Sequence, residues 1–142
     1  MQIHRHALVR YTPEQMFDLV NDVEAYPRRF PWCLGAHVTE HDDQHLVARL
    51  DLRFAGVTQH FSTRNVLERP HSIRMQFVHG PFDWLHGVWS FTPLGTAGCK
   101  VALDLDFEVS NKLTGFAFGL GFKKLADRMV DDFCAEARRA YG

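Results

Sequence analysis

The chain has 142 residues, 46% of them hydrophobic, which is enough to bury a sizeable core, and we expect one domain spanning residues 1–142. Its 16 Lys and Arg nearly balance 17 Asp and Glu, so the net charge of −1 excludes a global electrostatic attraction to nucleic acid or to an anionic membrane. Three widely spaced cysteines, no apolar leader and no run of ~20 apolar residues predict a soluble, reduced, cytoplasmic protein.

The first elements predicted are a strand and a helix. Residues 3–11 alternate loosely between apolar and polar, which is typical of a strand. Thr12 then suits the N-cap of a helix, Pro13 suits its first position, and Gln15 can complete a capping box. We therefore expect a first helix to begin at Pro13.

A second short helix is expected after residues 21–22, where Asn-Asp can end the first helix and cap the next one. Tyr26-Pro27 and Phe30-Pro31 should both leave helical geometry, because a proline disfavours the helical conformation of the residue before it. The segment therefore predicts a kinked pair of helices that ends in a loop.

From residue 34 to residue 109, apolar side chains recur at every second position, which indicates strands with one buried face. Turn signals at residues 42–44, 56, 70–72, 80–81 and 95–98 separate these runs. Consecutive hairpins imply an antiparallel sheet, so we expect about seven strands whose apolar face is covered by helices.

The last segment, residues 113–141, predicts one long amphipathic helix. Its apolar stripe recurs in steps of three and four and comprises Phe118, Phe122, Leu125, Met129, Phe133, Ala137 and Ala140. The fold class is therefore α+β, with a curved sheet gripping this helix.

Aromatic rings on the sheet face those on the helix, and large rings on a curved sheet can hold a helix away and leave a cavity. An ordinary filled core is the alternative. Gly115, Gly119 and Gly121 weaken the start of the helix, so this part is either a hinged entrance or a place of close packing. No catalytic or metal-binding motif is present in the sequence, and we expect neither an enzyme nor a bound cofactor.

Motifs along the whole chain carry a family resemblance. They are residues 11–24 (YTPEQMFDLVNDVE), Tyr26-Pro27, Pro31-Trp32-Cys33, Thr63-Arg64-Asn65, Gly80-Pro81-Phe82, residues 89–94 (WSFTPL), residues 105–108 (LDFE), Asn111-Lys112-Leu113 and Ala117-Phe118-Gly119. These segments resemble bacterial START-like domains of the coenzyme-Q-binding, polyketide-cyclase-like family, and specifically its ribosome association toxin branch.

The resemblance implies a helix-grip fold, in which a curved antiparallel sheet surrounds a long C-terminal helix with an apolar cavity between them. It also implies two functions. The leading hypothesis is non-enzymatic binding of a hydrophobic small molecule, ubiquinone, as a ligand that supports respiration. The alternative is binding to the large ribosomal subunit, which blocks its joining with the small one. A third, cyclase-like reading is disfavoured because no paired acid and base is evident.

We expect the ligand tunnel between residues 116–122 and the sheet, with the deeper helical turns simply packed and Gly119→Trp able to fill the tunnel. Thr63 and Asn65 are candidates to hydrogen-bond a quinone carbonyl, and the alternative is that they bond each other or the backbone. The predicted ligand-binding residues are Phe54, Phe61, Thr63, Asn65, Phe77, Trp89, Phe91, Phe116, Phe118, Phe122 and Met129.

Ribosome binding would need a basic face, because Lys and Arg that contact RNA phosphates release counterions. Arg5, Arg10, Arg28 and Arg29 could form such a face or could be scattered over the surface. We expect Arg28 and Arg29 to be exposed, so that reversing both charges would leave the fold intact. A quinone carrier would also touch a membrane surface transiently, and no DNA partner is expected.

Overall fold

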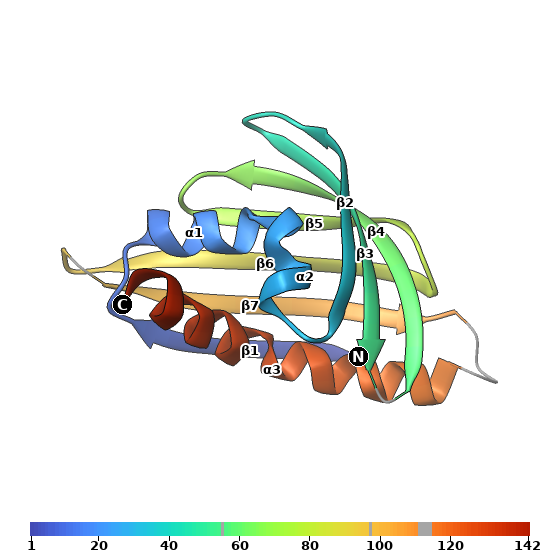
Figure 1. The fold of residues 1–142 in the computed structure, drawn as a ribbon. Coiled ribbons are helices and arrows are strands. Elements are labelled where there is room, and N and C mark those ends of the chain that lie inside the picture. The colour runs from blue at the N-terminus through green and yellow to red at the C-terminus, as the bar shows by residue number, and fades with distance from the viewer. Residues whose placement is uncertain (55, 97, 111–114) are drawn as a thin grey trace.

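One antiparallel sheet and one long helix dominate the structure (Figure 1). The computed structural model describes residues 1–54, 56–96, 98–110 and 115–142, and their side chains except those of 54 and 115–117. Its elements are β1 (Gln2–Val9), α1 (Pro13–Asn21), the 3-10 helix η1 (Val23–Ala25), α2 (Tyr26–Arg29), β2 (Cys33–His41), β3 (His45–Phe54), β4 (Val57–Glu68), β5 (Ser72–His79), β6 (Phe82–Leu94), β7 (Gly98–Val109) and α3 (Gly115–Tyr141).

The strands follow the order β1-β7-β6-β5-β4-β3-β2, and every neighbouring pair is antiparallel. Figure 1 shows the sheet curving strongly, so that β2 and β3 cross the direction of β6 and β7, while α3 runs along the side formed by β1 and β7. The helices cover the concave face, which confirms the predicted helix-grip arrangement and its seven strands.

The start of α1 matches its prediction in detail. The Thr12 side chain accepts a hydrogen bond from the Gln15 backbone N–H at 3.1 Å, and the Gln15 side chain accepts one from the Thr12 N–H at 2.9 Å. Pro13 occupies the first turn, where no N–H is needed. The capping box therefore fixes where the chain leaves β1 and enters the helical layer.

Two details of the next segment correct the sequence-based expectation. Asp22 precedes η1, but its side chain makes no capping hydrogen bond. Tyr26 is helical, with φ −55° and ψ −41°, although Pro27 follows it. Pro27 sits in the first turn of α2, where it costs no hydrogen bond, and the burial of Tyr26 outweighs the local preference. Phe30 is extended before Pro31, as predicted.

The long helix α3 buries the predicted stripe against the sheet. Phe122 and Phe133 are buried and Met129 is partly buried, which confirms that these three face the core. Ala126 and Val130 widen the buried face, whereas Ala140 is exposed, so its inclusion in the stripe was wrong. Residues 113–114, with which the helix was expected to begin, lie outside the described residues. Among the described helices, none is both long and apolar enough to cross a membrane.

Candidate functional site

An apolar cavity of about 60 Å³ lies between the helices and the concave face of the sheet. Its wall combines α1, η1 and α2 with strands β3 to β7 and the middle of α3. The described residues that line it are Val20, Val23, Tyr26, Ala48, Leu50, Phe61, Thr63, Asn65, Ile73, Met75, Leu85, Trp89, Leu103, Leu105, Phe122, Met129 and Phe133. Such a wall favours an apolar occupant.

Two neighbouring polar side chains on β4 interrupt this apolar wall. Thr63 and Asn65 are both buried, and the Thr63 hydroxyl donates to Asn65 Oδ1 at 2.9 Å. They therefore bond each other, as the alternative interpretation anticipated. This hydrogen bond uses only the Oδ1 atom of the Asn65 amide. The Asn65 NH₂ group makes no hydrogen bond in the described part, so its two N–H groups remain available as donors.

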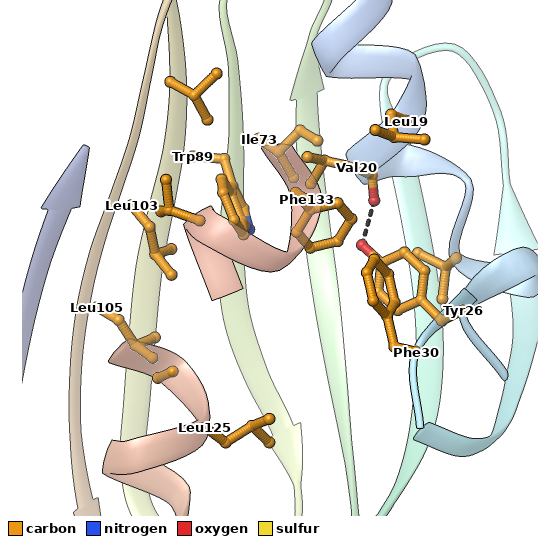
Figure 2. Packing of buried hydrophobic residues seen from close by; sticks show 14 of the residues in the cluster. Leu19, Val20, Tyr26, Phe30, Ile73, Trp89, Leu103, Leu105, Leu125 and Phe133 are labelled. Carbon is orange, nitrogen blue, oxygen red and sulfur yellow. Dashed lines mark hydrogen bonds between the residues drawn. The ribbon is translucent and has the colours of Figure 1, made fainter. Parts of the chain in front are cut away.

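Tyr26 supplies a third polar atom, which the fold already uses. Its hydroxyl donates to the Val20 carbonyl oxygen, as Figure 2 shows, and its ring packs against Phe133. Burial, followed by the neighbouring Cys33 and Asp22, raises the pKa of Tyr26 above its usual range. The hydroxyl is therefore neutral at physiological pH and holds α1 to α2.

Titratable groups are otherwise scarce around the cavity. No carboxylate, histidine, lysine, arginine or cysteine is among the described residues that line it. Within the described ranges, no cluster of three His, Cys, Asp or Glu side chains could hold a metal ion. Burial raises the pKa of the Cys33 and Cys99 thiols to about 11, which keeps both uncharged. Of the described residues that line the cavity, Tyr26, Thr63, Asn65 and Trp89 carry the polar side-chain atoms.

The cavity is small, and some of the side chains that line it can move more easily than others. Ligand sites are typically about 300–1,000 Å³, so the 60 Å³ enclosed here must widen to admit a molecule larger than a few waters. Leu50, Met75 and Met129 are half-buried, whereas most of the wall is buried. Methionine is unbranched and adopts many side-chain conformations, so the wall can yield most easily at Met75 on β5 and Met129 on α3.

Six of the predicted ligand-binding residues line the cavity together: Phe61, Thr63, Asn65, Trp89, Phe122 and Met129. Phe91, Phe77 and Phe118 do not. Phe91 packs on Phe17, while Phe77 and Phe118 contact Phe82 outside the cavity. The side chains of Phe54 and Phe116 lie outside the described residues.

The cavity lies deeper under α3 than predicted. Met129 and Phe133 line it, so the expectation that these turns are simply packed was wrong. Gly119 does not face the cavity, because a Cβ there would lie 2.9 Å from Met1 Cε and 3.6 Å from Val109. This glycine permits close packing of α3 on β1 and β7, and Gly119→Trp would not fill the cavity.

The helices α1 and η1 contribute Val20 and Val23, which the sequence-based site missed. Their contact with the sheet depends on where α1 and η1 lie in the tertiary structure, which the sequence pattern alone does not give.

The polar pair on β4 gives a stability prediction. In Asn65→Leu, the buried Thr63 hydroxyl loses its acceptor, and an unsatisfied buried group costs about 1–3 kcal/mol. The double variant Thr63→Val with Asn65→Leu removes both groups and should be more stable than Asn65→Leu by about 1 kcal/mol in urea unfolding. A double variant less stable than Asn65→Leu would contradict the pairing.

The four arginines considered for a ribosome contact do not form one free basic face. Arg5 Nη2 lies 3.7 Å from Asp131 Oδ2. Arg29 is 18% exposed and is bonded to two carboxylates, so the expectation that it is an exposed charge was wrong. Within the described part, Arg10 and Arg28 make no ion pair.

Known proteins resemble this chain over its whole length. The family model for polyketide cyclase / dehydrase and lipid transport matches residues 9–134. The ribosome association toxin RatA of Vibrio cholerae is 47% identical over 99% of this chain and 98% of its own length. The mitochondrial coenzyme Q-binding protein COQ10 homolog B of Xenopus laevis is 28% identical over 93% of this chain and 56% of its own.

Among solved structures, TTHA0849 from Thermus thermophilus superposes with a TM-score of 0.86 over 100% of both chains. Its sequence identity of 16% supports the fold alone. The family match and the RatA relative together cover the strands, the helices and the cavity described above. The chain therefore belongs to the polyketide cyclase / dehydrase and lipid transport family, within its RatA branch.

Proposed function

We propose that this protein binds ubiquinone in the cavity as a ligand, without a catalytic cofactor and without changing it chemically. The observation that carries this proposal is an apolar wall interrupted by one free amide donor, that of Asn65. The lipid-transport family and the coenzyme Q-binding relative support the same class of ligand.

The chemistry of a quinone suits the wall. Its ring is flat and apolar with two carbonyl acceptors, so one carbonyl can accept from the Asn65 NH₂ while Trp89 and Phe61 pack on the ring. The isoprenoid tail has no polar group and can leave past Met129 and Leu50. Because the cavity has a volume of only about 60 Å³, binding requires these two side chains to move.

A cavity-filling variant tests this proposal. Ala48 is buried on β3 directly opposite Thr63, so Ala48→Leu places carbon where the head group would sit. Protein purified from its native host should release ubiquinone into an organic extract, measured by mass spectrometry, and Ala48→Leu should release almost none. Ala7→Leu makes the same change at a half-buried strand position outside the cavity and should retain it.

The proposal is contradicted if native protein carries no quinone, or if Ala48→Leu carries as much as Ala7→Leu. Asn65→Leu should change which quinone head groups are retained more than the total amount bound, because it removes the donor and leaves the apolar wall intact.

A second candidate function is association with the large ribosomal subunit. The observation that favours it is the 47% identity, over 98% of its length, to a protein named a ribosome association toxin. We propose that this protein binds the large subunit and prevents subunit joining. Excess protein should then lower the fraction of joined ribosomes in sucrose gradients, and an unchanged profile would contradict it.

A further inference from the structure

A second hollow lies between α3, the loop before β2 and the end of β3, separate from the cavity. It has a volume of about 340 Å³ and shares no described lining residue with the cavity. We call it the basic groove, and its lining residues are Pro31, Trp32, Arg53, Gly121, Lys124, Leu125 and Arg128. The four residues from α3 are spaced by three, one and three, so they lie on one face of the helix.

Backbone and side-chain contacts hold the wall of this groove in place. The Arg53 N–H donates to the Trp32 carbonyl oxygen at 2.9 Å, which fixes the end of β3 beside the loop before β2. The Trp32 Nε1–H donates to Asp132 Oδ2 at 3.1 Å, which ties the same loop to α3. The Trp32 ring also stacks on Phe30, with ring centroids 4.9 Å apart. The groove is thus formed before any partner arrives.

The charged residues among the described lining of the groove are three cations, Arg53, Lys124 and Arg128. Arg53 and Lys124 make no ion pair within the described part, and Arg128 Nη2 lies 3.7 Å from Oδ2 of the half-buried Asp132. No carboxylate is among the described residues that line it. The hollow beside α1, of about 410 Å³, is instead lined by Asp18, Asp22 and Arg29 among others. In a chain of net charge −1, this concave place is therefore lined by two cations that make no ion pair in the described part and by a third that is paired with Asp132.

We propose that the basic groove is a docking surface for RNA phosphates, and that it forms the electrostatic part of the contact with the large ribosomal subunit. This inference rests on the second candidate function above. Three cations around one concave surface complement a phosphodiester backbone, which carries one negative charge per nucleotide. Arginine also pairs with phosphate in a two-point geometry that a single ammonium lacks.

The shape of the groove favours RNA over a membrane surface. Trp32 is 4% exposed and hydrogen-bonded, so its ring is not available to insert into a lipid interface. The cations surround a hollow, which admits a protruding backbone strand, whereas a lipid surface would first meet convex parts of the protein. Binding to anionic vesicles is therefore an outcome that the experiment must distinguish.

The test compares two triple variants of the full chain. The groove variant is Arg53→Gln with Lys124→Gln and Arg128→Gln. The control is Arg74→Gln with Lys100→Gln and Arg138→Gln, which removes three exposed charges that make no ion pair in the described part and lie outside the groove. Both should keep the melting temperature, since exposed charges contribute little to stability.

Affinity for isolated large subunits is measured by co-sedimentation over a series of salt concentrations. The groove variant should bind at least about tenfold more weakly than the native protein, and the control should bind like the native protein. A contact between one cation and one single-stranded phosphate adds about 0.7 to the salt slope, so losing three should flatten that slope by about two.

The outcomes separate the two ideas. If the native protein does not bind the large subunit, ribosome association itself is wrong, and the groove proposal falls with it. If the native protein binds and the groove variant binds as tightly as the control, the groove proposal is overturned while ribosome association stands. Loss of binding to phosphatidylglycerol vesicles by the groove variant, with subunit binding unchanged, would overturn RNA as the occupant in favour of a membrane.

Discussion

Phe133→Asp is expected to unfold most of the protein at 25 °C. Phe133 is 1% exposed and contacts the rings of Tyr26, Phe30 and Trp89 at centroid distances of 5.4, 4.8 and 5.3 Å. Figure 2 shows it between the sheet and α2. Truncating a buried phenylalanine costs about 3–5 kcal/mol, and a domain of this size is stable by about 5–15 kcal/mol.

The aspartate adds the cost of burying a carboxyl group among aromatic rings, and no cation is among the described residues that line this cavity. Circular dichroism melting checks this prediction. Phe133→Leu is the matched control, because it keeps an apolar side chain and should melt cooperatively at a moderately lower temperature. A Phe133→Asp protein that melts near the native temperature would mean that α3 does not hold the sheet through this residue.

Much of the fold was predictable because local signals and burial agree. The capping box at Thr12, the strand alternation and the spacing along α3 each need only nearby residues, and the structure bears out all three. Tyr26 shows the limit of local rules. The proline after it disfavours a helix by sterics alone, but the buried ring and the hydrogen bond to Val20 favour one, and neither is visible in the sequence.

The candidate site was predictable in chemistry and less so in position. Thr63 and Asn65 stood out as polar residues on an apolar strand face, and both line the cavity. The depth of the cavity under α3 depends on how far the sheet curves and on where α1 lies. Both are set by contacts between residues far apart in the sequence. Gly119 was assigned to the cavity because glycines weaken a helix start, but a side chain there would meet Met1 at the start of the chain and Val109 at the end of β7.

Arg29 was predicted to be an exposed charge, but it is a partly buried residue that links three helical segments. Its Nη1 donates to Glu136 Oε1 at 3.1 Å and its Nη2 to Asp22 Oδ2 at 3.4 Å, so it joins α2 to both α3 and the end of α1. Glu136 is 11% exposed in its side chain, and its other cation, Arg139, lies 3.6 Å away in an exposed position. Two adjacent arginines, Arg28 and Arg29, therefore have different roles.

Arg29→Glu is expected to lower the free energy of unfolding by about 3–5 kcal/mol, because it leaves the buried Glu136 carboxylate with only the exposed Arg139 as a partner and adds another carboxylate beside it. Arg28→Glu changes the neighbouring exposed side chain and should stay within about 0.5 kcal/mol of the native protein. Urea unfolding of the two single variants makes the comparison. Equal stability of the two would show that the Arg29 network contributes nothing.

The double variant Arg29→Met with Glu136→Leu should recover most of the loss. It replaces the buried pair with apolar side chains of similar length, and such exchanges are often neutral or stabilising. Failure of this recovery would mean that Arg29 acts through Asp22 instead of Glu136. A weakened ribosome contact in Arg29→Glu would therefore report lost folding before it reported lost RNA binding, whereas Arg53, Lys124 and Arg128 can be changed without breaking a buried pair.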